Sequence, residues 1–412
     1  MTAPAAAQGC KDFISTYADY ADVLEAPRIV HEAVAISILA AVLNPHVTIQ
    51  YGALPSTLDL WTLVLSGSGL GRNTLVNLAY PVLDASGLVR LIRSATWGSG
   101  PALYQDLAQN SIGLFIWPEI SQVLRTLSQS QFQGAKEWLT DRFDNPRPPD
   151  TVRYRATGQR TNTPPITFAE APRLNILATS SIEWLVPNLA REDTTGGFLP
   201  RWFIVRVTEP NRVIPKPNRP DSRLVPALGA HLREVVKLQG VADLSRVEDI
   251  YGTWYHVAHD RFARQPNSAM AMPFFNRLRT LVLKLAVIFE VSASRQLCVS
   301  PAAMQRAIAQ AASFEQTIFE LLPTGMTPEG FAQERMEKKI WQTGAPGITQ
   351  SELTRAFQDA KPRDRMERLS TLVHAGLVRA FRRTAGGRPG TIFVHSDFAA
   401  QHEKDCPNDT PG

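Results

Sequence analysis

The residues with the clearest capacity for chemistry lie between positions 66 and 74, where three glycines occur within five residues. Backbone N–H groups around closely spaced glycines can converge on an anion, and a helix N-terminus adds partial positive charge. The apolar run from Trp61 to Leu65 predicts a buried strand before the glycines, and apolar positions from Leu75 to Val82 recur at helical spacing after them. Strand, glycine loop and helix in this order predict a cradle for phosphate groups. A glycine turn that holds no ligand is the alternative.

The known phosphate-loop pattern is G-x-x-x-x-G-K-[ST], in which the lysine contacts the phosphates and the hydroxyl binds Mg²⁺. With Gly71 as the second glycine, Arg72 takes the lysine position and Asn73 takes the hydroxyl position. In a second register Arg72 is an insertion, so that Asn73 replaces the lysine and Thr74 supplies the hydroxyl. Neither register retains the lysine.

Two further predicted strands end in polar side chains. The run from Ser111 to Trp117 is followed by Glu119, with Pro118 where the first acid of an Asp-Glu pair is expected. In ATPases such carboxylates hold Mg²⁺ through water and orient the attacking water. The run from Leu174 to Ser181 ends in hydroxyls, which can sense a γ-phosphate if this strand lies between the first two. For Glu119, the alternative is a structural strand end.

The rest of the chain supplies the elements that must position these residues. Apolar periodicity predicts helices over residues 11–44, 101–108 and 134–144, and another buried strand directly after Arg201. A proline-rich connector follows at 209–221, and further helices are predicted at 230–238, 246–265, 274–292 and 301–322. Alternating strands and helices followed by helices alone predict an α/β core with a helical addition.

The last predicted module contains a basic hairpin. Helices are predicted at 334–342, 349–357 and 363–375, followed by strands at 376–383 and 391–395. This pattern resembles a winged helix-turn-helix, in which the third helix enters the DNA major groove and the wing touches the backbone. The resemblance implies these DNA-contacting residues: Arg363, Arg365, Arg368, Arg382, Arg383 and Arg388. A winged helix used for protein contacts is the alternative, and the tail from Asp397 is expected to be disordered.

Taken in order, these segments resemble the helicase-like P-loop ATPase family of phages, plasmids and integrated elements, a domain of unknown function often found beside primase modules. The resemblance runs from Lys11 to Leu321. It is carried by Ala26-Pro-Arg with His31-Glu-Ala, Leu60-Trp-Thr-Leu-Val-Leu, Ser68-Gly-Leu-Gly-Arg-Asn-Thr, Trp117-Pro-Glu-Ile-Ser, Gly134-Ala-Lys-Glu-Trp-Leu-Thr-Asp, Ile176-Leu-Ala-Thr-Ser-Ser-Ile-Glu-Trp-Leu and Gly196-Gly-Phe-Leu-Pro-Arg-Trp. It implies an α/β fold: a P-loop NTPase core of the RecA or AAA type with N-terminal helices, a helical lid or collar, and the C-terminal winged helix.

The resemblance also implies roles for individual residues. The family's loop has the form Ser-Gly-x-x-Arg-Lys-Ser/Thr, which favours the second register, with Asn73 at the lysine position and Thr74 as the Mg²⁺ ligand. The implied cofactors are ATP and Mg²⁺. Glu119 is an implied catalytic residue, and Arg201 an implied arginine finger that acts across a subunit boundary; an Arg201 that only pairs with a nearby acid is the alternative. The implied nucleotide-binding residues are Ser68, Gly69, Gly71, Arg72, Asn73 and Thr74, and the implied sensors are Thr179 and Ser180.

Asn73 predicts weakened hydrolysis, because an amide can donate a hydrogen bond but brings no positive charge to the phosphates. Arg72 could reach the phosphates instead. The predicted function is a helicase-like, ATP-binding, DNA-associated protein in the replication or mobility of a phage, plasmid or integrated element. Its expected partners are DNA, copies of itself in a homo-oligomer such as a hexameric ring, and a primase or another replication protein. A non-hydrolysing, nucleotide-gated DNA-binding or loading factor and a protein-interaction scaffold are the alternatives.

Composition sets the outer limits. The chain has 412 residues, 44% hydrophobic and 20% charged, with a net charge of +5, which is ordinary for a globular protein and permits an acidic partner. Cys10, Cys298 and Cys406 are far apart and predict neither a disulfide framework nor a metal pair, so a cytoplasmic location is expected. No membrane-spanning run or signal peptide is recognised. The predicted segments are an N-terminal helical region (1–54), an ATPase-like core (55–208), a linker (209–226), a helical domain (227–325), a winged helix (326–396) and a disordered tail (397–412).

Overall fold

A computed structural model of the chain describes residues 11–52, 54–67, 72–93, 97–144, 150–152, 165–169, 171–189, 191–207, 212–321, 328–383 and 390–411. The chain forms two compact units, Met1–Leu322 and Pro323–Gly412. The division lies close to the boundary predicted after residue 325. The predicted N-terminal, ATPase-like, linker and helical segments therefore belong to one unit.

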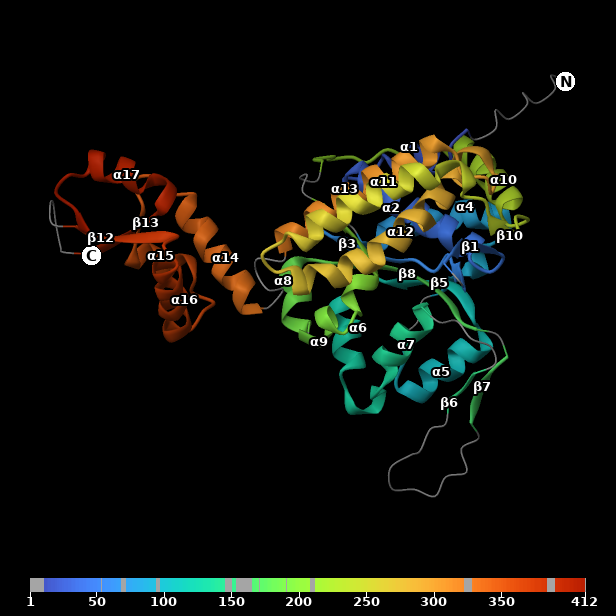
Figure 1. Cartoon of the computed structure of the whole chain (residues 1–412), viewed down its shortest axis with the longest axis horizontal. Coiled ribbons are helices and arrows are strands. Elements are labelled where there is room, and N and C mark those ends of the chain that lie inside the picture. The colour runs from blue at the N-terminus through green and yellow to red at the C-terminus, as the bar shows by residue number, and fades with distance from the viewer. Residues whose placement is uncertain are drawn as a thin grey trace. The chain divides into compact units, whose positions relative to one another are not determined.

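A five-stranded parallel sheet organises the first unit (Figure 1). Its strands, in spatial order, are β4 (Ile92–Arg93), β5 (Ile112–Trp117), β8 (Arg173–Ser180), β3 (Trp61–Leu65) and β9 (Trp202–Arg206). Four of them, β3, β5, β8 and β9, match predicted strands. Strand β8 lies between β3 and β5, as the predicted sensor role of its terminal hydroxyls requires. Every residue of β3 is buried, because helices cover both faces of the sheet. The α/β character of the core is therefore confirmed.

Helix α2 (Arg28–Leu43) packs on the central strands of this sheet. It is apolar on nearly every side, and Pro27 stands at its N-cap. Where the helix meets β3, Ser37 Oγ donates to Ala33 O and lies 2.9 Å from Thr62 Oγ1, so the polar groups inside this contact are satisfied. In Figure 1, α2, α12 and α13 are drawn on one side of β3 and β8, with α5, α6 and α7 on the other.

The remaining elements of the first unit surround this core. A second, three-stranded sheet contains β1 (Val47–Tyr51), β2 (Leu54–Thr57) and β10 (Gly240–Ala242), with β10 parallel to β1. The other strands and helices are α1 (Phe13–Ala21), α3 (Arg72–Asn77), α4 (Ala79–Ser86), α5 (Gly100–Gln109), α6 (Ile120–Leu127), α7 (Ala135–Asp144), β6 (Asp150–Val152), β7 (Ile166–Phe168), α8 (Ile182–Leu185), α9 (Arg191–Thr195), α10 (Val225–Val235), α11 (Glu248–Ala263), α12 (Ser268–Ser294) and α13 (Pro301–Leu321).

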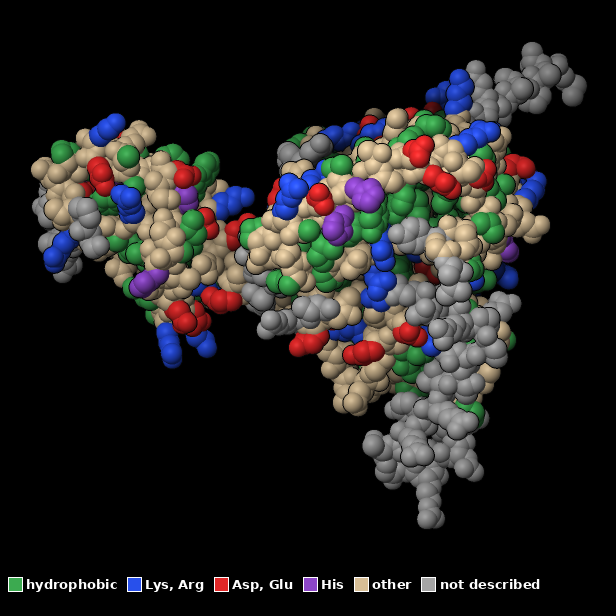
Figure 2. Space-filling view, in the orientation of Figure 1, with side chains coloured by type: hydrophobic (Ala, Val, Ile, Leu, Met, Phe, Trp, Pro, Cys, Tyr) green, Lys and Arg blue, Asp and Glu red, His purple; other side chains and the backbone are tan. Residues whose placement is uncertain are grey.

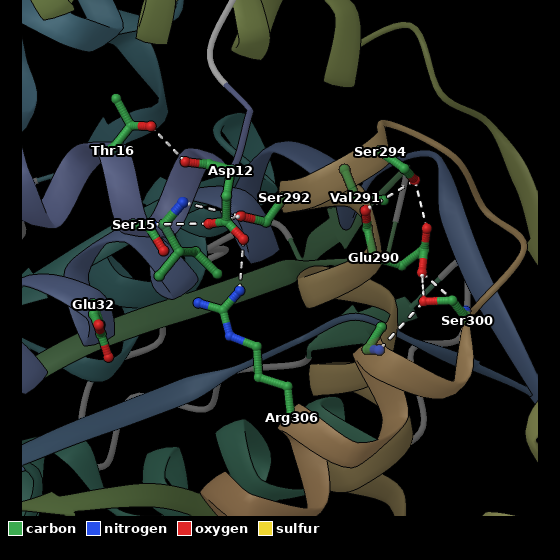
Figure 3. Close-up of polar contacts among 12 residues, drawn as sticks. Asp12, Ser15, Thr16, Glu32, Glu290, Val291, Ser292, Ser294, Ser300 and Arg306 are labelled. Atoms are coloured by element: carbon green, nitrogen blue, oxygen red, sulfur yellow. Dashed lines mark hydrogen bonds and ion pairs between the residues drawn. The ribbon is translucent and has the colours of Figure 1, made fainter.

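Polar contacts join the beginning of this unit to its last two helices (Figure 3). Asp12 caps α1 by accepting from Ser15 N at 2.9 Å. The same carboxylate accepts from Ser292 Oγ of α12 at 3.0 Å and from Arg306 Nη1 of α13 at 2.7 Å. Glu290 binds the turn between these helices, because its Oε2 accepts from Ser300 N at 2.9 Å. These contacts explain why the N-terminal helix and the helical segment form one unit with the sheet.

A buried acid links α12 to the sheet. Asp59, two residues before β3, is 1% exposed and accepts from Asn44 Nδ2 at 2.5 Å and from Thr57 Oγ1. Burial raises the pKa of Asp59, and the nearby Lys284 ammonium opposes that rise. Lys284 also donates to Asp59 O at 2.7 Å and lies 4.6 Å from the centre of the Phe143 ring. An unpaired charge buried here would be costly. The contact of Lys284 with Asp59 therefore ties α12 to the segment that leads into β3.

The second unit combines helices with an antiparallel sheet. Its elements are α14 (Pro328–Trp341), β11 (Ile348–Thr349), α15 (Gln350–Ala356), α16 (Pro362–His374), β12 (Val378–Arg383), β13 (Gly390–His395), α17 (Ser396–Asp405) and β14 (Thr410–Pro411). The sheet order is β11-β13-β12-β14. The predicted capping box is present, since Thr349 and Glu352 exchange hydrogen bonds at the start of α15. Met336, Leu353 and Leu372 belong to the core that the helices and the sheet share.

The predicted disordered tail at 397–412 is wrong. Helix α17 forms there, and β14 pairs with β12. The physical reason is burial against the hairpin strands: Ala399 is 2% exposed and Phe398 packs beside it. In the part of the chain that the structure describes, no helix has the length and apolar character needed to cross a membrane.

His31 of α2 provides a test of this core. It is 1% exposed, and burial lowers its pKa to about 4 from an ordinary value of 6.5. The unfolded chain therefore takes up the proton first, so stability is lost as the pH falls from about 6.5 towards 4. Moving from pH 7 to pH 5 should lower the free energy of unfolding by about 2 kcal/mol through this group. Urea unfolding followed by tryptophan fluorescence should show that loss in the natural chain but not in His31→Phe.

The matched control is His256→Phe, at an exposed position of α11. It should keep the acid sensitivity of the natural chain. Equal acid sensitivity in His31→Phe and the natural chain would contradict the role given to His31.

Candidate functional site

The candidate site lies at the carboxyl edge of the five-stranded sheet, where β3, β5 and β8 end together. Because the strands are parallel, the residues that follow them gather at one edge. The hydrogen-bond ladder continues one residue past β3, where Ser66 N donates to Ser180 O at 3.0 Å. Ser66 and Ser180 are both buried. The chain therefore leaves β3 towards the glycine loop from a fixed position.

Glu119 stands at this edge as the N-cap residue of α6. Its Oε1 accepts hydrogen bonds from Ser121 N at 3.3 Å, from Ser121 Oγ at 2.8 Å and from Ser180 Oγ at 2.5 Å. The side chain is half-buried. Partial positive charge at a helix N-terminus favours a carboxylate. The structure thus holds the Glu119 carboxylate in one orientation beside the end of β8.

The two predicted sensor hydroxyls are both engaged inside the protein. Thr179 Oγ1 donates to Pro118 O, and Ser180 Oγ donates to Glu119. Thr179 is 7% exposed and Ser180 is fully buried. Together they bind the turn after β5 to the end of β8. In this arrangement Ser180 orients Glu119.

The glycine loop itself is largely outside the described residues. Ser68, Gly69 and Gly71 are not described, and Arg72, Asn73 and Thr74 are described only as the first backbone positions of α3. The predicted strand before the loop and the helix after it are both present. Leu75 is buried, so α3 is anchored directly after the loop.

Arg201 lies at the opposite edge of the sheet from Glu119. It ends the short 3₁₀ turn Leu199–Arg201, immediately before β9, and donates to Gly197 O. Since β9 runs parallel to β3 over five residues, Arg201 is about 16 Å from the carboxyl edge. Within one chain, Arg201 and Glu119 are therefore not brought together.

Arg201 also lines two cavities. One, of about 840 Å³, lies between α7 and α9, and the 2.7 Å ion pair of Lys136 with Asp193 forms part of its wall. The other, of about 180 Å³, is lined by Arg201, Asp59, Arg277 and Lys284. Sequence reasoning missed this basic cavity, although Lys284 within an otherwise apolar helical stretch was a signal for a buried polar contact.

In the second unit, the predicted DNA-contacting arginines divide into two groups. Arg365 Nη1 donates to Phe357 O and Ala360 O, both at 3.0 Å, and so holds the end of α15. Arg368 forms a two-point ion pair with Glu329 of α14, at 2.7 and 3.1 Å. The exposed arginines are Arg363, Arg382 and Arg383, and Arg388 lies outside the described residues.

The structure thus unites Glu119, Thr179 and Ser180, separates Arg201 from them, and uses Arg365 and Arg368 in internal contacts. No protein-family model matches the chain, and a search of curated proteins finds no match either.

Proposed function

We propose that this chain is a helicase-like, nucleotide-binding protein that works on DNA, with a P-loop core in the first unit and a winged helix in the second. The observation that carries the proposal is the sheet order, in which β8 separates β3 from β5. The glycine loop follows β3 and Glu119 follows β5, and ligands of open parallel sheets bind outside the carboxyl ends of the strands.

The spacing of the strands suits a triphosphate. Adjacent strands lie about 4.8 Å apart, so β3 and β5 are about 10 Å apart across β8. A nucleotide bound by the loop at residues 68–74 would extend its terminal phosphate, with Mg²⁺ and a water molecule, across this distance towards Glu119. Mg²⁺ prefers carboxylate, hydroxyl and water oxygens, which Glu119 and Thr74 would supply. When bound, the metal would neutralise charge on the phosphates.

Glu119 is suited to a role with water because its orientation is maintained. A carboxylate that must accept a proton from water, or hold a water of Mg²⁺, works only from a fixed position. Ser121 and Ser180 restrict the carboxylate from two elements, α6 and β8. We assign Ser180 as a positioning residue for Glu119.

Hydrolysis is expected to be slow because Asn73 brings no charge to the phosphates. This residue also favours the second candidate function, a nucleotide-gated DNA-binding or loading factor that binds ATP without turning it over. For Arg201 to act on phosphates, it must do so in the site of a neighbouring copy, since it lies at the opposite edge from Glu119 in its own chain. Assembly into a homo-oligomer is therefore part of the proposal.

The second unit is proposed to bind DNA through α16 and the hairpin. Arg363 stands in the first turn of α16, and Arg382 and Arg383 lie on β12; all three are exposed. Figure 2 shows basic side chains at the surface of this unit, with acidic ones among them. A limited number of phosphate contacts, with moderate salt dependence, is expected from three arginines.

Nucleotide binding and turnover test the first part of the proposal. Titration with a fluorescent ATP analogue should show Mg²⁺-dependent binding to the natural chain, with slow release of phosphate. Asn73→Lys should raise the turnover rate by about tenfold or more, because it restores a charge at the phosphates. In that background, Glu119→Gln should abolish turnover but retain binding, and Ser180→Ala should reduce turnover by about tenfold.

Glu183→Gln is the matched control, since Glu183 is an exposed acid on α8. It should leave both binding and turnover unchanged. Binding by the natural chain without turnover in Asn73→Lys would favour the non-hydrolysing factor. Absence of nucleotide binding in both would reject the nucleotide-binding proposal.

DNA binding tests the second part. Replacing Arg363, Arg382 and Arg383 together by alanine should weaken binding of duplex DNA at low salt and reduce the slope of log K against log salt by about two to three. Fluorescence anisotropy at several salt concentrations measures both quantities. The control triple variant Lys338→Ala, Lys339→Ala and Lys404→Ala removes three positive charges from α14 and α17 of the same unit. Equal weakening in both triple variants would contradict a specific role for α16 and β12.

A further inference from the structure

Three potential metal ligands come together at the end of α17, in a region where sequence reasoning expected disorder. His402 lies in the last turn of this helix, Cys406 is its C-cap residue four positions later, and Asp409 follows in the turn before β14. One ligand atom of each residue lies within 4.8 Å of those of the other two. The chemistry is mixed: an imidazole nitrogen, a thiol sulfur and a carboxylate oxygen.

The hydrogen bonding of His402 fixes which of its ring nitrogens faces the cluster. Nδ1 lies 2.7 Å from Ala345 O. A carbonyl oxygen can only accept, so Nδ1 must carry a hydrogen and donate it. Among the residues that the structure describes, none is a hydrogen-bond partner of Nε2, although His402 is only 1% exposed, and Nε2 lies 3.4 Å from Asp409 Oδ2. A histidine that donates one nitrogen to a backbone carbonyl and directs the other to acidic groups is arranged as metal-ligating histidines are.

The backbone holds the other two groups in place. Cys406 caps the end of α17, with its N–H donating to His402 O at 2.8 Å, and Asp409 N donates to Cys406 O at 3.0 Å. Pairing of β14 with β12 anchors the chain directly after Asp409, whose side chain is 7% exposed. The His402 ring packs on Phe381 of β12, with 4.5 Å between ring centres. The cluster is therefore framed by α17, β12 and β14.

We propose that His402, Cys406 and Asp409 bind one zinc ion, with water as the fourth ligand. Zinc takes nitrogen, sulfur and oxygen ligands at about 2.0–2.3 Å in a tetrahedral arrangement, so the ligand atoms need to close by only about 1 Å. Mg²⁺ and Ca²⁺ are excluded as the preferred ions because they select oxygen ligands, whereas a thiolate with an imidazole selects zinc. A simple ion pair of His402 with Asp409 would not involve the Cys406 thiol, whereas zinc coordination would use all three groups.

The bound ion would fasten the last helix and strand of the second unit to the hairpin. Binding to the folded state alone would add to stability by mass action. This inference is independent of nucleotide and DNA binding by the chain.

The test uses the full chain, stripped with a chelator and reloaded with Zn²⁺ or Co²⁺. Elemental analysis after gel filtration should give one zinc per chain, and the cobalt form should show the visible bands of a tetrahedral ion with a thiolate-to-cobalt charge-transfer band. Cys406→Ser should abolish the charge-transfer band and weaken zinc binding by about tenfold or more. Asp409→Asn should also weaken binding, and circular dichroism should report both variants as folded.

The matched control is Cys298→Ser, since Cys298 is a thiol of the first unit, near Asp243. It should retain the stoichiometry and the cobalt spectrum of the natural chain. Zinc content near zero after reloading, or the same charge-transfer band in Cys406→Ser, would overturn the proposal.

Discussion

The position of β8 between β3 and β5 is the constraint on which the candidate site depends. Its hydrogen bonds to both neighbours bring the end of the glycine-loop strand and the end of the acid-bearing strand to one edge. The same pairing places the Ser180 hydroxyl against Glu119 and the Ser180 carbonyl against Ser66 N. A change in the order of these strands would remove the site while leaving each strand intact, because positions 66, 119 and 180 are far apart in the sequence and only the strand order brings them together.

Two polar junctions, a half-buried one at Asp12 and a buried one at Asp59, couple that sheet to the helices that follow it. Asp12 connects α1 with α12 and α13, and Asp59 with Lys284 connects the start of β3 with α12. Each junction is made of groups that are costly to bury unless they are paired. Paired polar groups restrict how the helical segment can pack on the sheet more than apolar contacts alone would. The basic cavity is lined by Asp59 and Lys284, the two residues of the second junction.

Much of the architecture was predictable because strong local patterns carry it. Apolar runs marked β3, β5, β8 and β9, and the Thr349 capping box marked the start of α15. The pairing of β10 with β1 had no local signal, since these strands are far apart in the sequence. Side-chain partners also depend on tertiary contacts. The sequence alone therefore did not distinguish Arg368, which binds Glu329, from Arg363, which is exposed. Helix α17 was missed because its segment is mostly polar, and polar composition is typical of disorder. Burial of only a few residues, such as Ala399 and His402, is enough to order it against the sheet.

The short strand β14 has a consequence beyond the order of the chain around it. In the sheet order β11-β13-β12-β14, it covers the outer side of β12 at Phe381 and Arg382. Without this cover, β12 would present open backbone donors and acceptors, which recruit strands from other molecules. Pairing with β14 therefore protects the β12 backbone at Phe381 and Arg382 from edge-to-edge aggregation. A shortened protein that lacks β14 would expose this backbone and would be expected to aggregate more readily, even with every other element intact.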